Sequence, residues 1–327
     1  MSNCCQLNAK AERITKAIDP LDDEGFKIIA KRLSLEIQRS VVPIQVRMLK
    51  LLLAKLSLDW LSLTIPQRIR IIRELETELN RLSSINAAAI LGLRKFSTSF
   101  ANKVHRAIPE GKTREASGES ADSSLKITEA FVQRRGHRRT VAVVASLLSS
   151  LTRLDESRTS EEISIELQGR VARFFNDTHY WDTVSTTHLN TLRSFEHVLA
   201  LDRVNVDHLM WVSVIDDVTT DICRFLGGKT FSVSNAVNNF RNATNILDAN
   251  GLDEFMIARP MITRRKVDDT LHVLEMPTSL GKIKIANEFT QGSGSVYEQL
   301  VDDALLEQFG VGLPPIHFSC RSQIRGL

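Results

Sequence analysis

The side chains best suited to metal chemistry are Cys223, His317 and Cys320. His317 and Cys320 are three residues apart and follow Pro314-Pro315. This diproline breaks regular structure and favours an extended, rigid segment. Thiolate and imidazole suit a tetrahedral zinc ion, so these three residues are candidate zinc ligands.

A fourth ligand is not evident. We expect Cys223 to lie on a turn after a strand, where Asp216, Asp217 and Asp221 offer carboxylate oxygens. Three soft ligands without a clear fourth make packed, metal-free thiols the favoured interpretation, with zinc as an alternative. A Cys223–Cys320 disulfide is less favoured in a reducing compartment. The sequence therefore predicts no cofactor.

Catalytic signatures are absent from the sequence. Gly227-Gly228-Lys229-Thr230 resembles part of a phosphate-binding loop, but Cys223 occupies the position of the required first glycine. No HExxH or GxSxG motif occurs, nor a GxGxxG motif preceded by a strand. We therefore predict no catalytic residues and a protein that is not an enzyme.

One dense basic cluster, QRRGHRR, spans 133–139. Its arginines could neutralise nucleic-acid phosphates, and they are Arg134, Arg135, Arg138 and Arg139. Residues 1–110 are also basic, with 18 Lys and Arg against 11 Asp and Glu. An exposed start to an apolar helix over Val141–Leu154 is the favoured alternative for the cluster, and a solvated helix surface for the basic first third.

The first third of the chain predicts helices over residues 8–108. Apolar residues recur every four positions from Ile44 to Leu56, which indicates a helix with one packed face. Thr64 and Gln67 have capping-box spacing and predict the start of a long helix. Its heptad-like seam favours intramolecular packing over an intermolecular coiled coil. The seam comprises Ile65, Ile69, Ile72, Leu75, Leu79 and Leu82.

The remainder predicts a smaller α+β region. Residues 111–125 are rich in Ser, Gly and charge and predict a flexible linker. A capping box of Thr159 and Glu162 predicts another helix, and Thr183–Leu199 a further one. Short β-prone runs occur at 207–215, 229–233, 271–276 and 282–286. The predicted fold is α+β and predominantly α, with a helical region (1–110), a linker and an α+β domain (126–327).

Bulk properties fit a globular chain of 327 residues with 43% hydrophobic residues. The first six residues lack the basic and apolar regions of a secretory signal, so none is expected. No uncharged apolar run is long enough to predict a membrane span. Four unevenly placed cysteines predict no disulfide framework.

Two segments in the last third of the chain resemble the phage Mu F-like family of minor head proteins. The stretch Trp211–Phe231 is similar to a family strand followed by D-x-x-T-C-x-x-C and L-x-G-x-x-F, and Leu313–Ser322 to the closing P-P-x-H-P-x-C-R. The helix Thr183–Leu199 lies where the family has a helix carrying Thr, Asn and Arg. The resemblance implies a structural motif of Trp211, Asp217, Cys223, Gly227, Gly228, Pro314, Pro315, His317, Cys320 and Arg321.

Three departures from the family pattern accompany the resemblance. Thr220 replaces the first cysteine of the C-x-x-C pair, so the family's four-ligand set is incomplete. Phe318 replaces a proline after the histidine. About eighty residues, at 232–312, separate the two motifs, and we expect this insertion to decorate the domain.

The resemblance implies a minor capsid protein of a tailed bacteriophage, associated with the portal vertex and assisting head assembly, DNA packaging or genome delivery. The implied partners are the portal protein, the major capsid protein and packaged DNA, with multiple copies around the portal and no membrane. The implied location is the virion, after assembly in the host cytoplasm. The alternatives are a phage-encoded effector enzyme or toxin, and a DNA-binding internal head protein.

Overall fold

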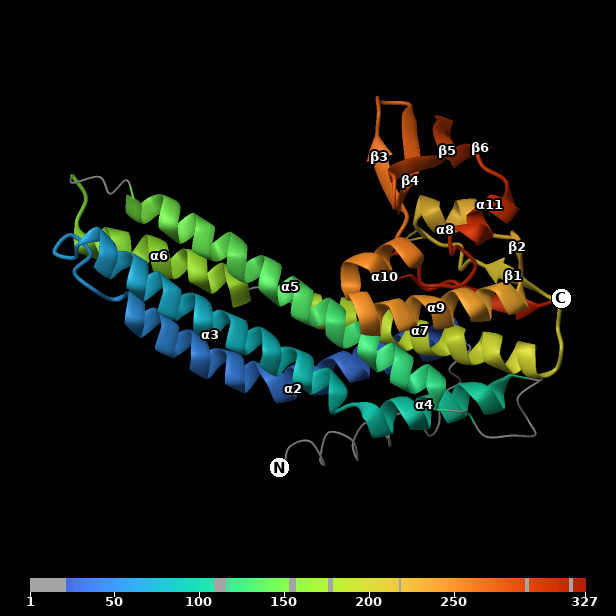
Figure 1. The fold of residues 1–327 in the computed structure, drawn as a ribbon, viewed down its shortest axis with the longest axis horizontal. Helices are drawn as coiled ribbons and strands as arrows, with labels where there is room; N and C mark the ends of the chain where they lie inside the picture. The colour runs from blue at the N-terminus through green and yellow to red at the C-terminus, as the bar shows by residue number, and fades with distance from the viewer. Residues whose placement is uncertain are drawn as a thin grey trace.

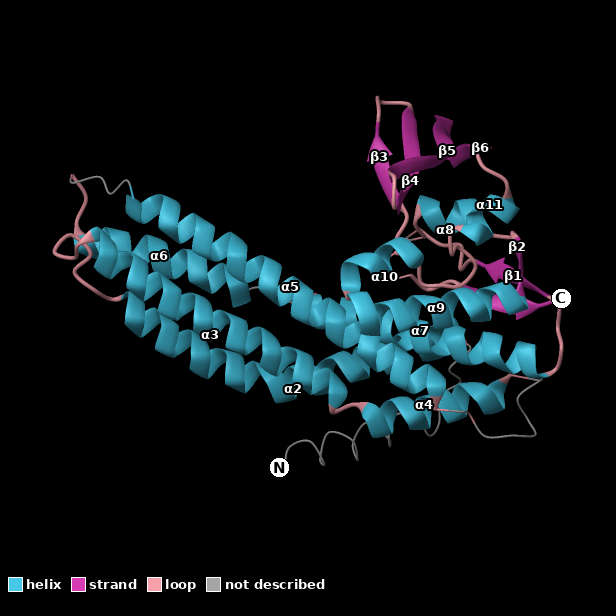
Figure 2. Ribbon diagram, viewed as in Figure 1, coloured by secondary structure: helices cyan, strands magenta, loops and turns pink. Residues whose placement is uncertain are grey.

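The fold consists of a long helical arm joined to a compact end that contains both helices and strands (Figure 1). It is known from a computed structural model, which describes residues 22–108, 116, 118–152, 157–175, 179–217, 219–291, 294–317 and 320–327. The predicted class, α+β and predominantly α, is confirmed, because helices predominate and all strands of the described residues lie in the C-terminal part (Figure 2). None of the described helices is long and apolar enough to cross a membrane.

The arm is built from antiparallel helices. Its members are α2 (Asp23–Leu56), α3 (Ile65–Leu91), α5 (Glu119–Thr152) and α6 (Ser160–Phe175), while α4 (Arg94–Ala107) and α7 (Tyr180–Arg203) continue into the compact end. The capping box that starts α3 is confirmed, since the Thr64 backbone N–H donates to Gln67 Oε1 at 2.8 Å. The box at Thr159 and Glu162 is also confirmed, with reciprocal bonds of 2.8 and 3.2 Å.

The heptad-like seam of α3 packs within the chain. Its last four residues, from Ile72 to Leu82, are buried in a cluster with Trp60 and with residues of α5 and α6. The first two, Ile65 and Ile69, remain exposed. Most of the seam therefore forms intramolecular helix packing, as the sequence favoured.

Helix α5 corrects two sequence predictions. The expected linker at 111–125 is helical from Glu119 onward, while 109–115 and 117 lie outside the described residues. Ser120 and Ser124 are buried, and their hydroxyls donate to Glu196 and to the His188 carbonyl of α7. The composition of the segment does not reveal these partners. The basic cluster 133–139 also lies in mid-helix, not at the start of a helix.

Gly136, at the centre of that cluster, permits the close contact between α5 and α3. A Cβ at position 136 would overlap the Cβ and Oγ of Ser83 on α3. Because Ser83 Cβ is fixed to its own backbone, a rotamer change cannot relieve this overlap. The helix thus accepts the low helical propensity of glycine to bring the two helices together.

We expect Gly136→Ala to lower the free energy of unfolding by about 1 kcal/mol. Overpacking costs roughly 1–3 kcal/mol, and the better helical propensity of alanine returns about 1 kcal/mol. Gly169→Ala is the matched control, because no atom lies within 4 Å of a Cβ built at this position of α6. Urea unfolding should show opposite shifts for the two variants. A stabilised Gly136→Ala protein would contradict the close contact.

The compact end contains two antiparallel sheets. The first has the order β2-β1-β7, from Thr230–Ser232, His208–Val212 and Gln323–Gly326. The second is a meander of β3 (Thr263–Lys266), β4 (Leu271–Thr278), β5 (Gly281–Gln291) and β6 (Gly294–Gln299). The remaining helices are α8 (Asp221–Leu226), α9 (Val233–Asn250), α10 (Leu252–Ala258) and α11 (Asp303–Gln308).

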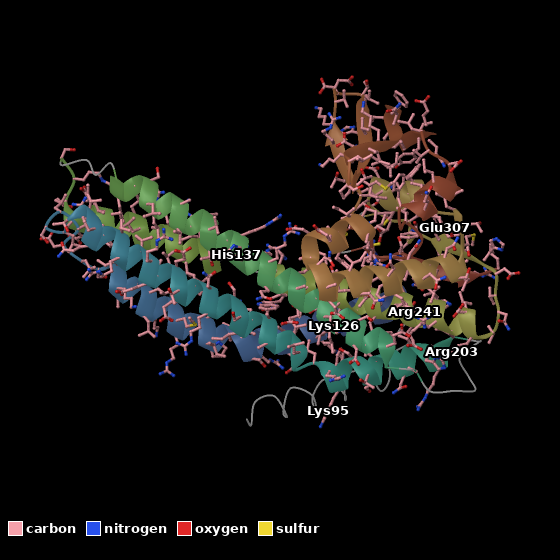
Figure 3. All side chains as sticks on the ribbon, in the orientation of Figure 1. Lys95, Lys126, His137, Arg203, Arg241 and Glu307 are labelled. Carbon is pink, nitrogen blue, oxygen red and sulfur yellow. The ribbon has the colours of Figure 1, made fainter. Side chains whose placement is uncertain are left out.

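Helix α7 lies between two hydrophobic clusters. One cluster contains its Phe195 and Leu199 together with Trp211. The other contains its Leu189 and Leu192 together with residues of α2, α3, α4 and α5. Ion pairs Lys126–Asp248 and Arg241–Glu119 join α5 to α9 outside these cores; Lys126 and Arg241 are labelled in Figure 3. The helical arm and the compact end therefore share α7 as a common core element.

The expected insertion at 232–312 is part of this core. Its Val237 and Phe240 on α9 and its Leu274 on β4 are buried in the same cluster as Trp211. The segment contains α9, α10, the meander and α11. It does more than decorate the domain, because removing it would expose the α9-facing side of α7.

His188 of α7 is buried in a hydroxyl cage. Its Nδ1 lies 3.0 Å from Ser124 Oγ and 3.1 Å from Thr128 Oγ1, and its Nε2 lies 2.9 Å from Ser97 Oγ. Ser124 and Thr128 already donate to backbone carbonyls, so we assign the ring proton to Nδ1. Burial lowers the pKa of His188 to about 4, so the ring is neutral at pH 7.

Candidate Cys-His-Cys site

Cys223 is placed by helix α8, not by the expected turn. Thr220 is the N-cap of α8 and accepts the Cys223 backbone N–H through its Oγ1 at 3.3 Å. The preceding strand β1 ends at Val212, and Ser213 Oγ donates to the Cys223 carbonyl. This short capped helix aims the Cys223 side chain at the C-terminal segment.

Three polar side chains hold the backbone of that C-terminal segment. The guanidinium of Arg259 donates to the carbonyls of Leu313 and Pro314 at 3.1 and 3.0 Å. Asn190 Nδ2 on α7 donates to the Cys320 carbonyl at 2.8 Å. Arg193, one turn later, donates to the Arg321 and Ser322 carbonyls at 3.1 and 3.4 Å. We call this set of hydrogen bonds, with residues 313–317 and 320–322, the C-terminal clasp.

The three candidate ligands come together in the structure. Cys223 Sγ lies 2.9 Å from His317 Nε2 and 3.7 Å from Cys320 Sγ. One ligand atom from each lies within 4.8 Å of the other two. Ser322 Oγ also donates to Cys223 Sγ at 3.1 Å. Cys223, His317 and Cys320 are therefore close enough together to hold a metal ion.

The two thiols differ in protonation. Hydrogen bonds from Cys320, His317 and Ser322, with the nearby charge of His317, lower the pKa of Cys223 to about 4. Burial and the neighbouring Cys223 sulfur raise the pKa of Cys320 well above its usual value. Cys223 is therefore the more acidic of the two thiols, and this difference favours Cys320 as the S–H donor to Cys223.

The fourth side of this cluster is occupied by Thr220. Its Oγ1 lies 3.0 Å from His317 Nε2, so Thr220 lies beside the three candidate ligands. A threonine hydroxyl is not among the usual zinc ligands. The three soft ligands fit zinc, but the fourth position does not supply a strong one.

The nearby carboxylates are not part of the cluster. Asp216 accepts two hydrogen bonds from Arg321, at 2.7 and 2.8 Å. Asp221 pairs with Arg264 at 3.1 Å, and Asp217 is exposed. Among the described residues, the metal-competent group contains only the two cysteines and the histidine. The expected oxygen ligands are therefore not brought to the cluster.

A thiolate beside an imidazole is also the arrangement of cysteine nucleophiles. Reaction with a substrate requires access to the sulfur. Cys223 is 4% exposed and Cys320 is 0% exposed. This burial suits a structural pair better than an attacking group.

No family model, curated protein or solved structure matches the chain. The resemblance to Mu F-like minor head proteins therefore stays a prediction that rests on the two motifs.

The other residues of the predicted motif surround the same place. Trp211 is fully buried and contacts Phe231 edge-on, with ring centroids 6.4 Å apart. Gly228 has φ of +81° and its N–H donates to the Trp211 carbonyl, which explains the glycine of this turn. Arg321 also pairs with Asp23 of α2 at 3.1 Å. The motif thus links the C-terminal segment to the first described helix.

Two charged residues of the inserted segment, Arg259 of the clasp and Glu275 of β4, belong to no motif in the sequence. Both are buried. Arg259 binds the segment before Pro315, whose peptide bond with Pro314 is cis, and Glu275 pairs with Arg265 at 2.8 Å. A lone arginine outside a motif carries no sequence signal for such a role, because its partners are backbone carbonyls.

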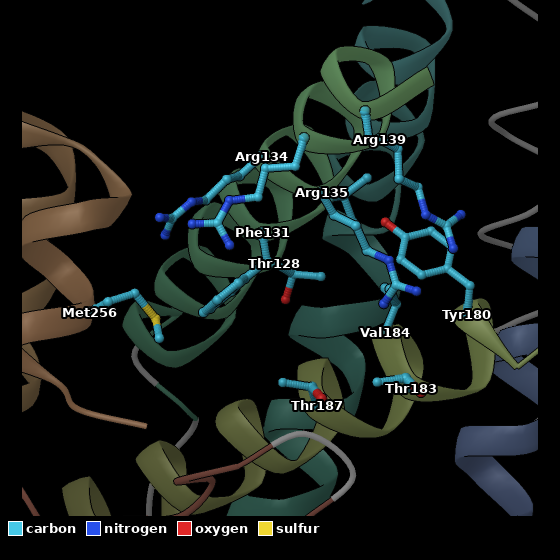
Figure 4. Close-up of a pocket in the computed structure, with 13 residues that line it drawn as sticks. Thr128, Phe131, Arg134, Arg135, Arg139, Tyr180, Thr183, Val184, Thr187 and Met256 are labelled. Carbon is cyan, nitrogen blue, oxygen red and sulfur yellow. The ribbon is translucent and has the colours of Figure 1, made fainter. Parts of the chain in front are cut away.

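The predicted nucleic-acid contacts lie on α5, which carries none of the three cluster residues. Arg135 and Arg139 lie over the Tyr180 ring, with guanidinium carbons 4.5 and 5.8 Å from its centroid. Arg134 forms an ion pair with Asp253 of α10. These arginines, with Arg138, line one pocket (Figure 4). The cluster is therefore partly engaged within the molecule and is not a uniformly free basic face.

Proposed function

We propose that this protein is a structural minor head protein of a tailed bacteriophage, associated with the portal vertex. The observation that carries the proposal is the approach of the two family-like motifs, which are about eighty residues apart in sequence. Cys223 from the first and His317 and Cys320 from the second form one buried cluster. Helix α7, where the family has Asn and Arg, supplies Asn190 and Arg193 to the clasp.

In this proposal the Cys-His-Cys cluster has a folding role. Hydrogen bonds to its backbone and the contact between the two cysteine sulfurs close the C-terminal segment over α7 and α8. Zinc would take Cys223, His317 and Cys320, with water in the fourth position, and would bind weakly because Thr220 is not a strong ligand. The protein therefore acts through its surfaces and not through a reaction at this cluster.

The helical arm supplies an exposed apolar stripe for a partner. Ile28, Leu35, Val42 and Val46 are spaced by seven, seven and four residues on α2, and each is about 39–46% exposed. This spacing places them on one face of the helix. Helix α2 lies along the outer edge of the arm (Figure 1). Such a face supports the docking of a helix or groove of the portal protein.

We expect Leu35→Glu with Val42→Glu to abolish incorporation into phage heads without unfolding the protein. Both side chains are already exposed, so charge there costs little stability but opposes burial in an interface. Ile165→Glu on α6 is the matched control, because Ile165 is 62% exposed and lies off this stripe. Quantitative mass spectrometry of purified heads measures incorporation. Equal incorporation of both variants would exclude α2 as the docking face.

The proposed function itself is tested in a phage that carries this gene. Purified wild-type particles should contain the protein in few copies, and particles made without the gene should have altered protein composition or reduced infectivity. Expression of the intact gene from a plasmid should restore both. Absence of the protein from particles, together with normal infectivity of the deletion phage, would reject a minor head protein.

A further inference from the structure

A pocket of about 470 Å³ lies between α5, α7 and α10, where the arm meets the compact end. Its inner wall is apolar and includes Phe131, Val132, Val184 and Met256. Figure 4 shows Met256 on the α10 side and Val184 on α7 below the helix that carries the arginines. This volume is typical of sites that enclose most of a small organic molecule.

The polar side of the pocket is formed by four arginines within two turns of α5. They are Arg134, Arg135, Arg138 and Arg139. No carboxylate is among the described residues that line the pocket, and Asp253 of α10, which pairs with Arg134, is outside this lining. Arg134 extends toward α10, whereas Arg135 and Arg139 extend toward Tyr180 (Figure 4). Guanidinium groups thus flank an apolar interior on two sides. Their planar N–H groups suit carboxylate, sulfonate or phosphate oxygens.

Stacking orders two of these arginines. Tyr180 holds the Arg135 guanidinium 4.5 Å from its ring centroid, which reduces the conformational entropy that the side chain loses on binding. Arg138 is exposed and can move toward an anion. Duplex DNA would use the positive charge but has no group to fill the apolar interior. An anion with an apolar body uses both parts of the pocket.

We propose that this pocket binds an amphiphilic organic anion. Its acidic group lies among the arginines of α5, and its apolar body lies against Phe131, Val184 and Met256. The proposal concerns binding alone and does not depend on a role in phage heads.

The test uses two fluorescent probes with closely similar apolar bodies. 8-Anilinonaphthalene-1-sulfonate carries a permanent negative charge, and N-phenyl-1-naphthylamine is neutral. We expect saturable binding of the anion at one site on the full-length protein. Arg135→Gln with Arg138→Gln should raise its Kd at least tenfold, and should change the Kd of the neutral probe less than twofold.

A second variant tests the apolar body independently. Ala142 lines the pocket and is exposed, so Ala142→Trp should fill the opening without disturbing the core, and should weaken both probes at least tenfold. Arg70→Gln, an exposed position on α3, is the charge control and should change neither Kd. Thermal unfolding verifies that each variant is folded. If the double variant does not fold, Arg138→Gln alone gives the comparison.

Three results would overturn the proposal. The first is binding of the anion that does not saturate or is unaffected by Ala142→Trp, which would place the probe elsewhere. The second is an equal loss of both probes on neutralising the arginines, which would show that they do not recognise the acidic group. The third is displacement of the anion by duplex DNA, with DNA binding lost in the arginine variants, which would identify a nucleic-acid surface.

Discussion

Replacing Thr220 by cysteine is expected to turn the Cys-His-Cys cluster into a four-ligand zinc site. The wild-type group offers two sulfurs and one imidazole within 4.8 Å of one another. Thr220 occupies the fourth side of the cluster, with its Oγ1 3.0 Å from His317 Nε2. A cysteine there completes the Cys₃His set that structural zinc sites use.

The substitution has a small structural cost and a larger gain in metal affinity. Thr220 caps α8, and loss of an N-cap costs about 1 kcal/mol. A third thiolate removes the need for a weakly held water, so we expect the zinc Kd to fall by at least about tenfold. Zinc should then raise the thermal stability of Thr220→Cys more than that of the wild type, because a ligand that binds only the folded state stabilises it.

Competition with a chromophoric chelator measures the zinc Kd, and Co²⁺ substitution reports the number of thiolates through its near-ultraviolet absorption. Thr220→Ser is the matched control, since it keeps the capping hydroxyl and adds no soft ligand. Cys223→Ser in the Thr220→Cys background should lose the gain. An unchanged Kd for Thr220→Cys would mean that position 220 does not face the other three ligands in solution.

Helix boundaries could be predicted where local signals are strong. The Thr64–Gln67 and Thr159–Glu162 boxes start α3 and α6, because capping depends on residues only three positions apart. The start of α5 could not be predicted, since Ser120 and Ser124 look like linker residues until α7 provides Glu196 and His188 as partners. Strands β3 and β6 pair with neighbouring strands of the meander but were missed because most of their residues are polar and exposed. Strand β7 was missed because its partner β1 is more than a hundred residues away in the sequence.

The candidate site could likewise be predicted only in part from the sequence. Residue types predicted that Cys223, His317 and Cys320 could share a site, and the fold brings them together. Sequence spacing could not show that Asp216 is held by Arg321, or that Asp221 faces Arg264. It also could not identify Arg259, because a side chain that binds backbone carbonyls leaves no pattern in the residues it contacts.

Arg193→Met is expected to open the C-terminal clasp and to lower the free energy of unfolding by about 2–4 kcal/mol. Arg193 is 2% exposed and its guanidinium lies 4.0 Å from the centre of the Phe26 ring on α2. The same guanidinium group donates to Asn190 Oδ1 at 2.7 Å and to the Arg321 and Ser322 carbonyls. Methionine fills much of the volume but leaves these buried acceptors without donors, each at a cost of roughly 1–3 kcal/mol.

The loss of stability is smaller than the sum of the lost hydrogen bonds, because the buried charge that the substitution removes is itself unfavourable. Burial lowers the pKa of Arg193 to about 10, which reflects how unfavourable a buried guanidinium is. Part of the lost hydrogen bonding is therefore offset by relief of desolvation. Arg193→Lys should lie between wild type and Arg193→Met, since a single ammonium cannot reach acceptors on both α7 and the C-terminal segment.

Two measurements separate an open clasp from general destabilisation. Urea unfolding gives the free energy, and the rate at which a thiol reagent modifies Cys320 in native buffer reports opening around this fully buried side chain. Arg193→Met should accelerate modification more than Gly136→Ala, which weakens the arm and leaves the clasp intact. Arg173→Met, at an exposed position on α6, is the control and should change neither quantity. Equal acceleration in Arg193→Met and Gly136→Ala would mean that Cys320 becomes accessible only by global unfolding, and that Arg193 does not hold the segment locally.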